Sequence, residues 1–156
     1  MQERNLTIYF TSDLHSYIYP TDYRSQEEKD LGLFKCASQF QKDGNTLIID
    51  GGDLLQGSPL GAFCHDTVGS AAQFAQIMNR CGYDYVTLGN HDFNYGMPYL
   101  DSYLDALRAR CVCENVRWAG GGVRFPARVH VLENGLRIGI VGIVTDYVNI
   151  WERPEH

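Results

Sequence analysis

Five residues with metal-binding or acid–base side chains occur in three short segments of the sequence: Asp13 and His15, then Asp53, then Asn90 with His91. Carboxylate and amide oxygens combined with imidazole nitrogens, without thiolates, suit Mn²⁺, Zn²⁺, Fe or Mg²⁺ rather than a structural zinc site. Asp53 lies between the other two segments, so its carboxylate could bridge two cations. Cations about 3.5–4 Å apart can hold both the attacking and the leaving oxygen of a phosphoryl displacement.

Each segment alone also has a structural explanation. An Asp that follows two glycines commonly shapes a turn, and Asn90 could cap a helix beside an exposed His91. The position of all three segments favours a site, because each directly follows a predicted strand: Leu6–Ser12, Thr46–Asp50 and Asp84–Leu88. Ligands of open α/β sheets bind beyond the carboxyl ends of the strands, where these side chains would meet.

Helical periodicity appears between these strands. Apolar residues from Leu33 to Phe40 predict a helix that ends near Gly44, and further helices are predicted over Ser70–Cys81 and after Pro98. The alternation of strands and helices predicts an α/β layered domain. Beyond these elements the sequence predicts a short strand at 111–115, a glycine-rich turn at 120–122, and a hairpin that pairs 128–132 with 136–144 across an Asn-Gly turn.

Composition limits the class of protein. The 156 residues suffice for one domain, and 44% hydrophobic with 21% charged residues is typical of a globular chain. The net charge of −6 and the scattered arginines argue against a nucleic-acid groove but allow small phosphorylated substrates. No apolar run reaches the roughly 20 residues of a membrane span. Five cysteines without framework spacing favour reduced thiols and a cytoplasmic location, the alternative being an exported protein whose leader has been removed.

Four blocks carry a family resemblance: TSDLHS at 11–16, GGDLLQGSPLG at 51–61, GYDYVTLGNHDFNYG at 82–96 and RIGIVGIVTD at 137–146. In this order they resemble the N-terminal part of the catalytic domain of calcineurin-like metallophosphoesterases, specifically the 5′-nucleotidase and 2′,3′-cyclic-nucleotide 2′-phosphodiesterase group. The resemblance implies a layered sandwich of βαβ units with a mixed sheet. Residues 1–156 would form the N-terminal portion of that catalytic domain, so only its N-terminal half would be present.

The resemblance also implies roles for the five residues. Asp13 and His15 would ligate the first of two divalent cations, Asp53 would bridge, and Asn90 would ligate the second. His91 would be the catalytic histidine that faces the phosphoryl group and the leaving oxygen during in-line attack. The substrate would be a nucleotide or another small phosphate ester.

Two departures from the family pattern matter. Relatives that are 5′-nucleotidases carry an Asp three residues after the catalytic histidine, which orients its ring, whereas this chain has Asn94. The Asn94 amide can still accept a hydrogen bond from the imidazole N–H of His91, without the charge of a carboxylate. The cyclic-nucleotide branch resembles the chain better, with Asn at this position and a tyrosine-rich stretch as at 17–23. We therefore expect hydrolysis of a 2′,3′-cyclic nucleotide to the 3′-monophosphate, the alternative being a 5′-nucleotidase or another phosphomonoesterase.

The second departure is that later histidine ligands of the family find no match. His65 is predicted to lie on a surface loop, His130 on a strand and His156 at the end of the sequence. The second cation would keep only Asp53 and Asn90. We expect these residues alone to be inactive, as part of an enzyme completed by a C-terminal half or as a non-catalytic metal-binding half-domain. An open sheet edge would also favour self-association.

Overall fold

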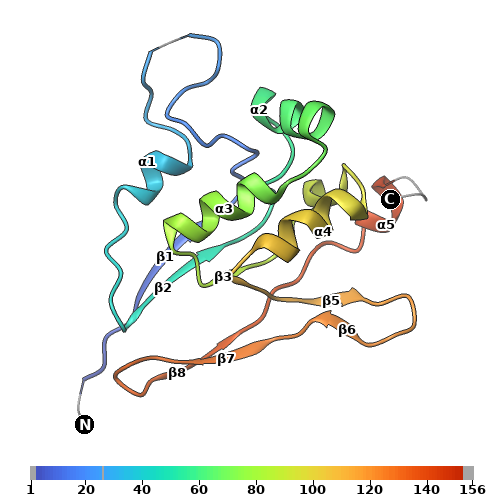
Figure 1. The fold of residues 1–156 in the computed structure, drawn as a ribbon. Coiled ribbons are helices and arrows are strands. Elements are labelled where there is room, and N and C mark those ends of the chain that lie inside the picture. Colours follow the sequence, from blue (N-terminus) through green and yellow to red (C-terminus); the bar gives the residue numbers. More distant parts are fainter. Residues whose placement is uncertain (1–2, 26, 153–156) are drawn as a thin grey trace.

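The computed structural model describes residues 3–25 and 27–152, and its centre is a four-stranded parallel sheet (Figure 1). The strands lie in chain order: β1 (Thr7–Thr11), β2 (Thr46–Asp50), β3 (Tyr85–Val86) and β4 (Arg110–Cys111). The parallel register pairs Thr11 with Asp50 and Asp50 with Val86. The carboxyl ends of β1, β2 and β3 therefore reach the same edge, as the positions of the three polar segments require.

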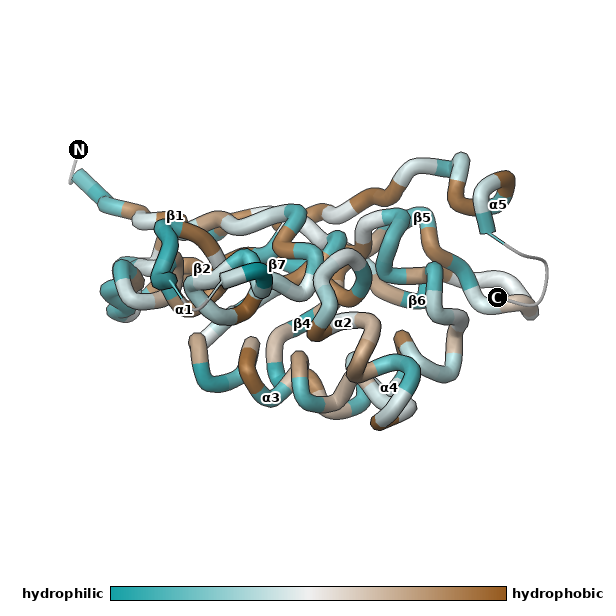
Figure 2. Tube along the Cα trace, turned by 90° about the horizontal axis from the view of Figure 1, so that it is seen from above, coloured by the Kyte–Doolittle hydropathy of each residue, from teal (hydrophilic) through white to brown (hydrophobic). Residues whose placement is uncertain are grey.

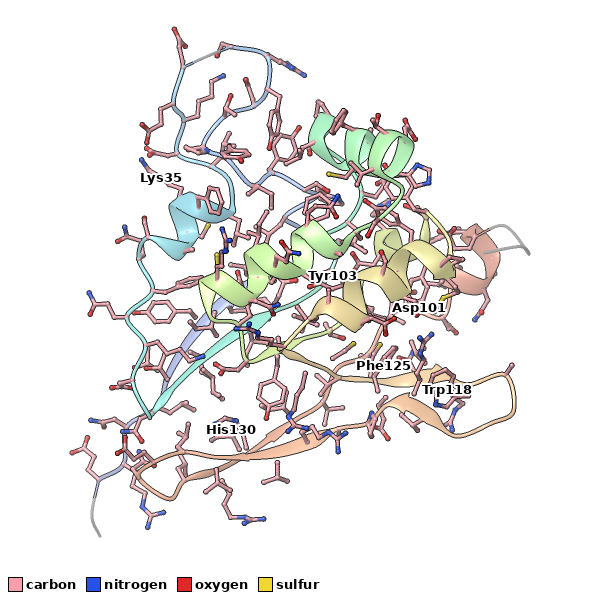
Figure 3. The ribbon with its side chains drawn as sticks, in the orientation of Figure 1. Lys35, Asp101, Tyr103, Trp118, Phe125 and His130 are labelled. Carbon is pink, nitrogen blue, oxygen red and sulfur yellow. The ribbon has the colours of Figure 1, made fainter. Side chains whose placement is uncertain are left out.

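Helices cover one face of this sheet. They are α1 (Leu33–Ala37), α2 (Pro59–Phe63) with the π-helical turn η1 (Cys64–Val68), α3 (Ala72–Cys81), the 3₁₀ turn η2 (Asn90–Phe93) and α4 (Met97–Ala106). Figure 2 shows α2, α3 and α4 on the same side of the strands. Buried Phe74 and Met78 of α3 and Leu100 and Tyr103 of α4 join the main core, which holds the sheet side chains Ile48 and Val86. Figure 3 labels Tyr103 on α4.

Two antiparallel hairpins follow the sheet. The first joins β5 (Cys113–Arg117) to β6 (Val123–Phe125), and the second joins β7 (Arg128–Val131) to β8 (Arg137–Ile140). Beyond them comes the short helix α5 (Val148–Trp151). A second apolar cluster on the other face of the sheet contains Leu47, Tyr85, Val112, Leu132 and Ile140, so the β7–β8 hairpin covers part of that face.

The remaining part of that face is open at β1. Ile8 and Phe10 are exposed there, and β1 has a hydrogen-bonded neighbour only in β2 among the described residues. The parallel strands and the antiparallel hairpins form separate sheets, so the expected combination of directions is present without a single mixed sheet. No helix in the described part of the chain is long and apolar enough to cross a membrane.

Four local predictions were wrong. The strand expected at 111–115 is divided at Val112 into β4 and β5, which belong to different sheets. Helix α1 ends at Ala37 rather than near Gly44, because Phe40 packs against Tyr9 at 5.1 Å between ring centroids instead of extending the helix. His65 lies in η1 rather than in a loop. Strand β8 ends at Ile140 rather than at residue 144, because the chain then leaves the hairpin and the Gly142 carbonyl accepts a hydrogen bond from the β5 backbone.

Candidate metal centre and phosphoryl site

The loops after β1, β2 and β3 are joined by hydrogen bonds. The Asp13 N–H donates to the Gly52 carbonyl at 3.0 Å, and the His15 N–H donates to the Asp53 carbonyl at 2.8 Å. The Asp53 carboxylate accepts from the His91 N–H at 2.8 Å. The structure thus brings together the three segments whose side chains were expected to meet.

Two glycines let the loops after β2 and β3 approach closely. Gly52 has φ +93°, and a Cβ there would lie 2.3 Å from the Gly89 nitrogen. A Cβ at Gly89 would lie 2.1 Å from Oδ1 of Asp53. Neither position has space for a side chain, so these glycines set the distance between Asp53 and the segment that carries His91.

Several site residues have unusual backbone conformations. Asp13, His15 and Asp53 have φ values of 54°, 46° and 57°, in the left-handed region that non-glycine residues seldom occupy. Such conformations cost on the order of 1–3 kcal/mol each and concentrate at functional sites. Here they turn the three side chains toward one point, which the loop hydrogen bonds hold in place.

Asp13, His15 and Asp53 fit a divalent cation. One ligand atom from each lies within 4.8 Å of the others, and the part of the chain that the structure describes holds no second such group of three His, Cys, Asp or Glu residues. The Nδ1 atom of His15 lies 2.7 Å from the Gln56 carbonyl, so Nδ1–H donates there and Nε2 is left for a metal. The donor set of two carboxylates and one imidazole suits Mn²⁺, Zn²⁺, Fe or Mg²⁺.

The His91 ring lies beside this group. Its centroid is 5.3 Å from that of His15, and its Nδ1 atom is 2.7 Å from Oδ1 of Asn94. Asn94 also donates through Nδ2 to the Glu152 carboxylate. Asn90 is half-buried and begins η2 directly before His91. The amide expected to hold the imidazole is therefore placed to do so.

The other histidines lie elsewhere. His65 stacks on Tyr95 with 4.0 Å between ring centroids, and His130 contacts the Tyr85 hydroxyl at 3.1 Å from β7. His156 lies outside the described residues. Neither His65 nor His130 joins the group around Asp53 in the part of the chain that the structure describes, and a second cation held by Asp53 and Asn90 stays a prediction.

The side chain of Asp92 connects the loops that follow β2 and β3. It is buried, and its two oxygens accept four backbone hydrogen bonds of 2.9–3.0 Å, from Asp53, Leu54, Leu55 and Gly89. Burial raises the pKa of Asp92, and the four N–H donors oppose that rise by favouring the carboxylate. The sequence alone allows Asp92 either to hold the loop by hydrogen bonds or to face solvent, and the geometry shows that it holds the loops.

Asp50 is a second buried carboxylate beneath the site, and sequence reasoning missed it. It accepts hydrogen bonds from the Gly52 N–H at 3.0 Å and from the Thr11 hydroxyl at 2.5 Å. Burial raises the pKa of Asp50 to about 7, with smaller contributions from the negative charges of Asp92 and Asp13. A carboxylate at the last position of an apolar strand was the available signal, since such a residue is rarely buried without a specific role.

Comparison with known proteins identifies the family of this chain. The family model for calcineurin-like phosphoesterase matches residues 6–153. The trifunctional nucleotide phosphoesterase YfkN of Bacillus subtilis is 34% identical over 96% of this chain, and a 2′,3′-cyclic-nucleotide 2′-phosphodiesterase/3′-nucleotidase of Yersinia enterocolitica is 32% identical over 96%. A crystal structure of a candidate 5′-nucleotidase from Staphylococcus aureus superposes with a TM-score of 0.83 at 32% identity, over 96% of this chain.

The chain spans only part of these relatives: 12% of the Bacillus protein, 26% of the Yersinia protein and 30% of the Staphylococcus chain. Within that part the family model covers the whole sheet, the three loops at its carboxyl edge and the hairpins that follow. The chain belongs to the calcineurin-like phosphoesterase family.

Proposed function

We propose that the complete protein in which this chain occurs hydrolyses a nucleotide phosphate ester with the help of two divalent cations. The observation that carries the proposal is the group formed by Asp13, His15 and Asp53, whose ligand atoms lie within 4.8 Å of one another, with the His91 ring beside it. Relatives that share this part of the chain are phosphoesterases that act on nucleotides, by their names.

The protein residues have separate tasks in this reaction. Bound cations would supply positive charge that stabilises the phosphoryl oxygens and favours ionisation of water. His91 donates a hydrogen bond from Nδ1 to Asn94, so its Nε2 atom is left to face the phosphoryl group. When the ring also carries a proton on Nε2, it can give that proton to the leaving oxygen and return to the neutral form with hydrogen on Nδ1. Asp53 accepts from the His91 N–H and so links the ligand group to the histidine in fixed geometry.

Our proposed substrate is a 2′,3′-cyclic nucleotide, opened at the 2′ oxygen to give the 3′-monophosphate. Asn94 supports this choice, because its place next to the histidine resembles the cyclic-nucleotide branch of the family. The name of the Yersinia relative points the same way. The alternative hypothesis is 5′-nucleotidase activity, which is favoured by a rat 5′-nucleotidase that is 31% identical over 96% of this chain.

The test is an assay of the complete protein, loaded with Mn²⁺, on cyclic 2′,3′-AMP, 5′-AMP and bis-p-nitrophenyl phosphate. We expect turnover of the cyclic nucleotide and of the diester. Turnover of 5′-AMP alone would show that the substrate assignment is wrong, whereas failure on all three substrates would remove the enzymatic proposal itself.

A matched pair of variants tests the role of His91. We expect His91→Gln to lower kcat by about 10²–10⁴-fold, the usual contribution of a positioned acid or base. His130→Gln is the control, because His130 lies on β7 beside Tyr85 and keeps an acceptor for that hydroxyl after substitution. Equal activity of the two variants would show that His91 takes no part in the reaction.

Residues 1–156 alone should bind one cation better than two. Asp13, His15 and Asp53 supply one site, whereas the second has only Asp53 and Asn90. We therefore expect this chain by itself to lack turnover and to regain it when the rest of the protein is present. Calorimetric titration with Mn²⁺ would measure the stoichiometry, and two tight sites on the isolated chain would contradict this expectation.

A further inference from the structure

A residue from the end of the described chain reaches the candidate histidine through Asn94. The Asn94 side chain donates from Nδ2 to a carboxylate oxygen of Glu152, which is 58 positions away in the sequence. Its other side, Oδ1, accepts from Nδ1 of His91 at 2.7 Å. Glu152 follows α5 directly, so the short helix places its carboxylate against the Asn94 amide.

The chemistry of the Glu152 carboxylate decides which way the Asn94 amide is oriented. The oxygen and the nitrogen of an Asn side chain have nearly the same shape, so packing alone barely distinguishes the two orientations. An ionised carboxylate accepts hydrogen bonds and donates none. Glu152 therefore requires the NH₂ group of Asn94 on its own side, which leaves the Asn94 oxygen for His91.

This orientation in turn selects one tautomer of His91. An oxygen facing Nδ1 requires the ring to carry its hydrogen there, so that Nε2 is the nitrogen left to act on substrate. A reversed amide would present its NH₂ group to Nδ1 and stabilise the opposite tautomer, with hydrogen on Nε2. We propose that Glu152 is a positioning residue that fixes the Asn94 amide and, through it, the tautomer and orientation of His91.

The surroundings of Glu152 make it suitable for substitution. It lines a cavity of about 800 Å³ together with Phe93, Met97 and residues of the β5–β6 hairpin such as Trp118, which projects from that hairpin in Figure 3. Truncation at this position therefore enlarges an existing space instead of creating a void in the core. Asn149 lines the same cavity and its side chain contacts the Asp146 carbonyl, which makes it a matched control on the same short helix.

The inference rests on the proposed role of His91, and kinetics on the complete, Mn²⁺-loaded protein give its first test. We expect Glu152→Ala to lower kcat about 10-fold with KM changed less than twofold, since second-sphere partners typically contribute 10–100-fold and Glu152 is not assigned to bind substrate. Asn149→Ala should keep kcat within twofold. Unchanged kcat in Glu152→Ala would overturn the proposal.

A rescue experiment distinguishes the positioning role of Glu152 from a role in which it only holds the end of the described chain in place. An Asp at position 94 presents only oxygen to His91 whatever lies behind it, so Asn94→Asp should make the protein independent of Glu152. We expect the double variant Asn94→Asp with Glu152→Ala to recover most of the activity that Glu152→Ala loses. If Glu152 only held the chain end in place, the double variant would be as impaired as Glu152→Ala, and that result would also overturn the proposal.

Nitrogen chemical shifts of His91 provide a readout without turnover. In the complete protein loaded with diamagnetic Zn²⁺, we expect hydrogen on Nδ1 in the parent protein and in Asn149→Ala, and a mixture of tautomers in Glu152→Ala. A single unchanged tautomer in Glu152→Ala would refute the positioning role. If no phosphate ester is turned over but the tautomer still responds to Glu152, the proposed function fails while the positioning role stands.

Discussion

The candidate site has two sides that are held in different ways. On the Asp13 side, which comprises Asp13, His15 and Asp53, main-chain hydrogen bonds connect loops that follow neighbouring strands, and the buried carboxylate of Asp92 ties them together. On the His91 side, which comprises Asn90, His91, Asn94 and Glu152, the histidine ring is held through side chains, in a series that includes half-buried Glu152.

This difference matches the different structural requirements of metal ligands and of the proposed acid, His91. Ligands of a cation need fixed distances, and backbone hydrogen bonds under a buried carboxylate provide them. A histidine that moves a proton needs a defined tautomer, which one amide and one carboxylate can supply without a rigid backbone frame. Substitutions on the Asp13 side should therefore affect stability and metal binding, whereas those on the His91 side should affect turnover.

Asp92→Asn should have the largest effect on stability. Each oxygen of Asp92 accepts two backbone N–H groups, so an NH₂ group in place of either oxygen faces two donors and leaves them without an acceptor. Buried unsatisfied donors cost about 1–3 kcal/mol each, so we expect a loss of roughly 3 kcal/mol in the free energy of unfolding. Denaturant unfolding would measure it, with exposed Asp105→Asn as the control. A loss below about 1 kcal/mol, the cost of one such donor, would show that Asp92 is not the support of the Asp13 side.

Metal affinity gives the next comparison. Asp53 is available to both proposed cations, while Asp13 serves one, so Asp53→Asn should weaken Mn²⁺ binding more than Asp13→Asn does. We expect losses of about 100-fold and about 10-fold, the range seen when groups around a metal are removed. An Asn oxygen can still accept from the His91 N–H, which limits the effect of Asp53→Asn on the fold. Calorimetry on the complete protein would measure both, and equal losses would argue against a bridging role.

The Asp13 side could be predicted from the sequence because each ligand is close in sequence to the strand that positions it. Each ligand segment follows an apolar strand within a few residues, and strand β2 was predicted with its observed ends. Helix α2 was missed although a signal exists, since Ser58 caps it by accepting from the Gly61 N–H and Pro59 begins it. Serine followed by proline at a helix start is a recognised pattern.

The His91 side could be anticipated only in part. The pairing of His91 with Asn94 spans three residues, and the sequence indicated it. The contact between Asn94 and Glu152 depends on how the hairpins return the chain to η2, and no local pattern encodes that path. Strand β6 was missed for a related reason, since its three residues follow a glycine-rich turn and carry too little periodicity.

A further expected effect is a pH dependence of stability that arises from Asp50, which lies close to the Asp13 side in sequence and in the sheet. Burial raises the pKa of Asp50 to about 7 from an ordinary value of 3.8. Between these values the folded protein holds a proton that the unfolded chain has released, so this group's contribution to stability is largest at low pH and declines as pH rises toward 7. We expect the metal-free protein to lose on the order of 2 kcal/mol between pH 5 and pH 8 relative to Asp50→Asn.

Asp50→Asn isolates that contribution because the amide can keep both hydrogen bonds. Its oxygen can accept from the Gly52 N–H, and its NH₂ group can donate to the Thr11 hydroxyl, which also contacts the Tyr83 hydroxyl at 2.7 Å. Thermal unfolding of both proteins at pH 5, 6.5 and 8 would give the difference. The same pH dependence of stability in Asp50→Asn and in the parent protein would contradict this contribution of Asp50.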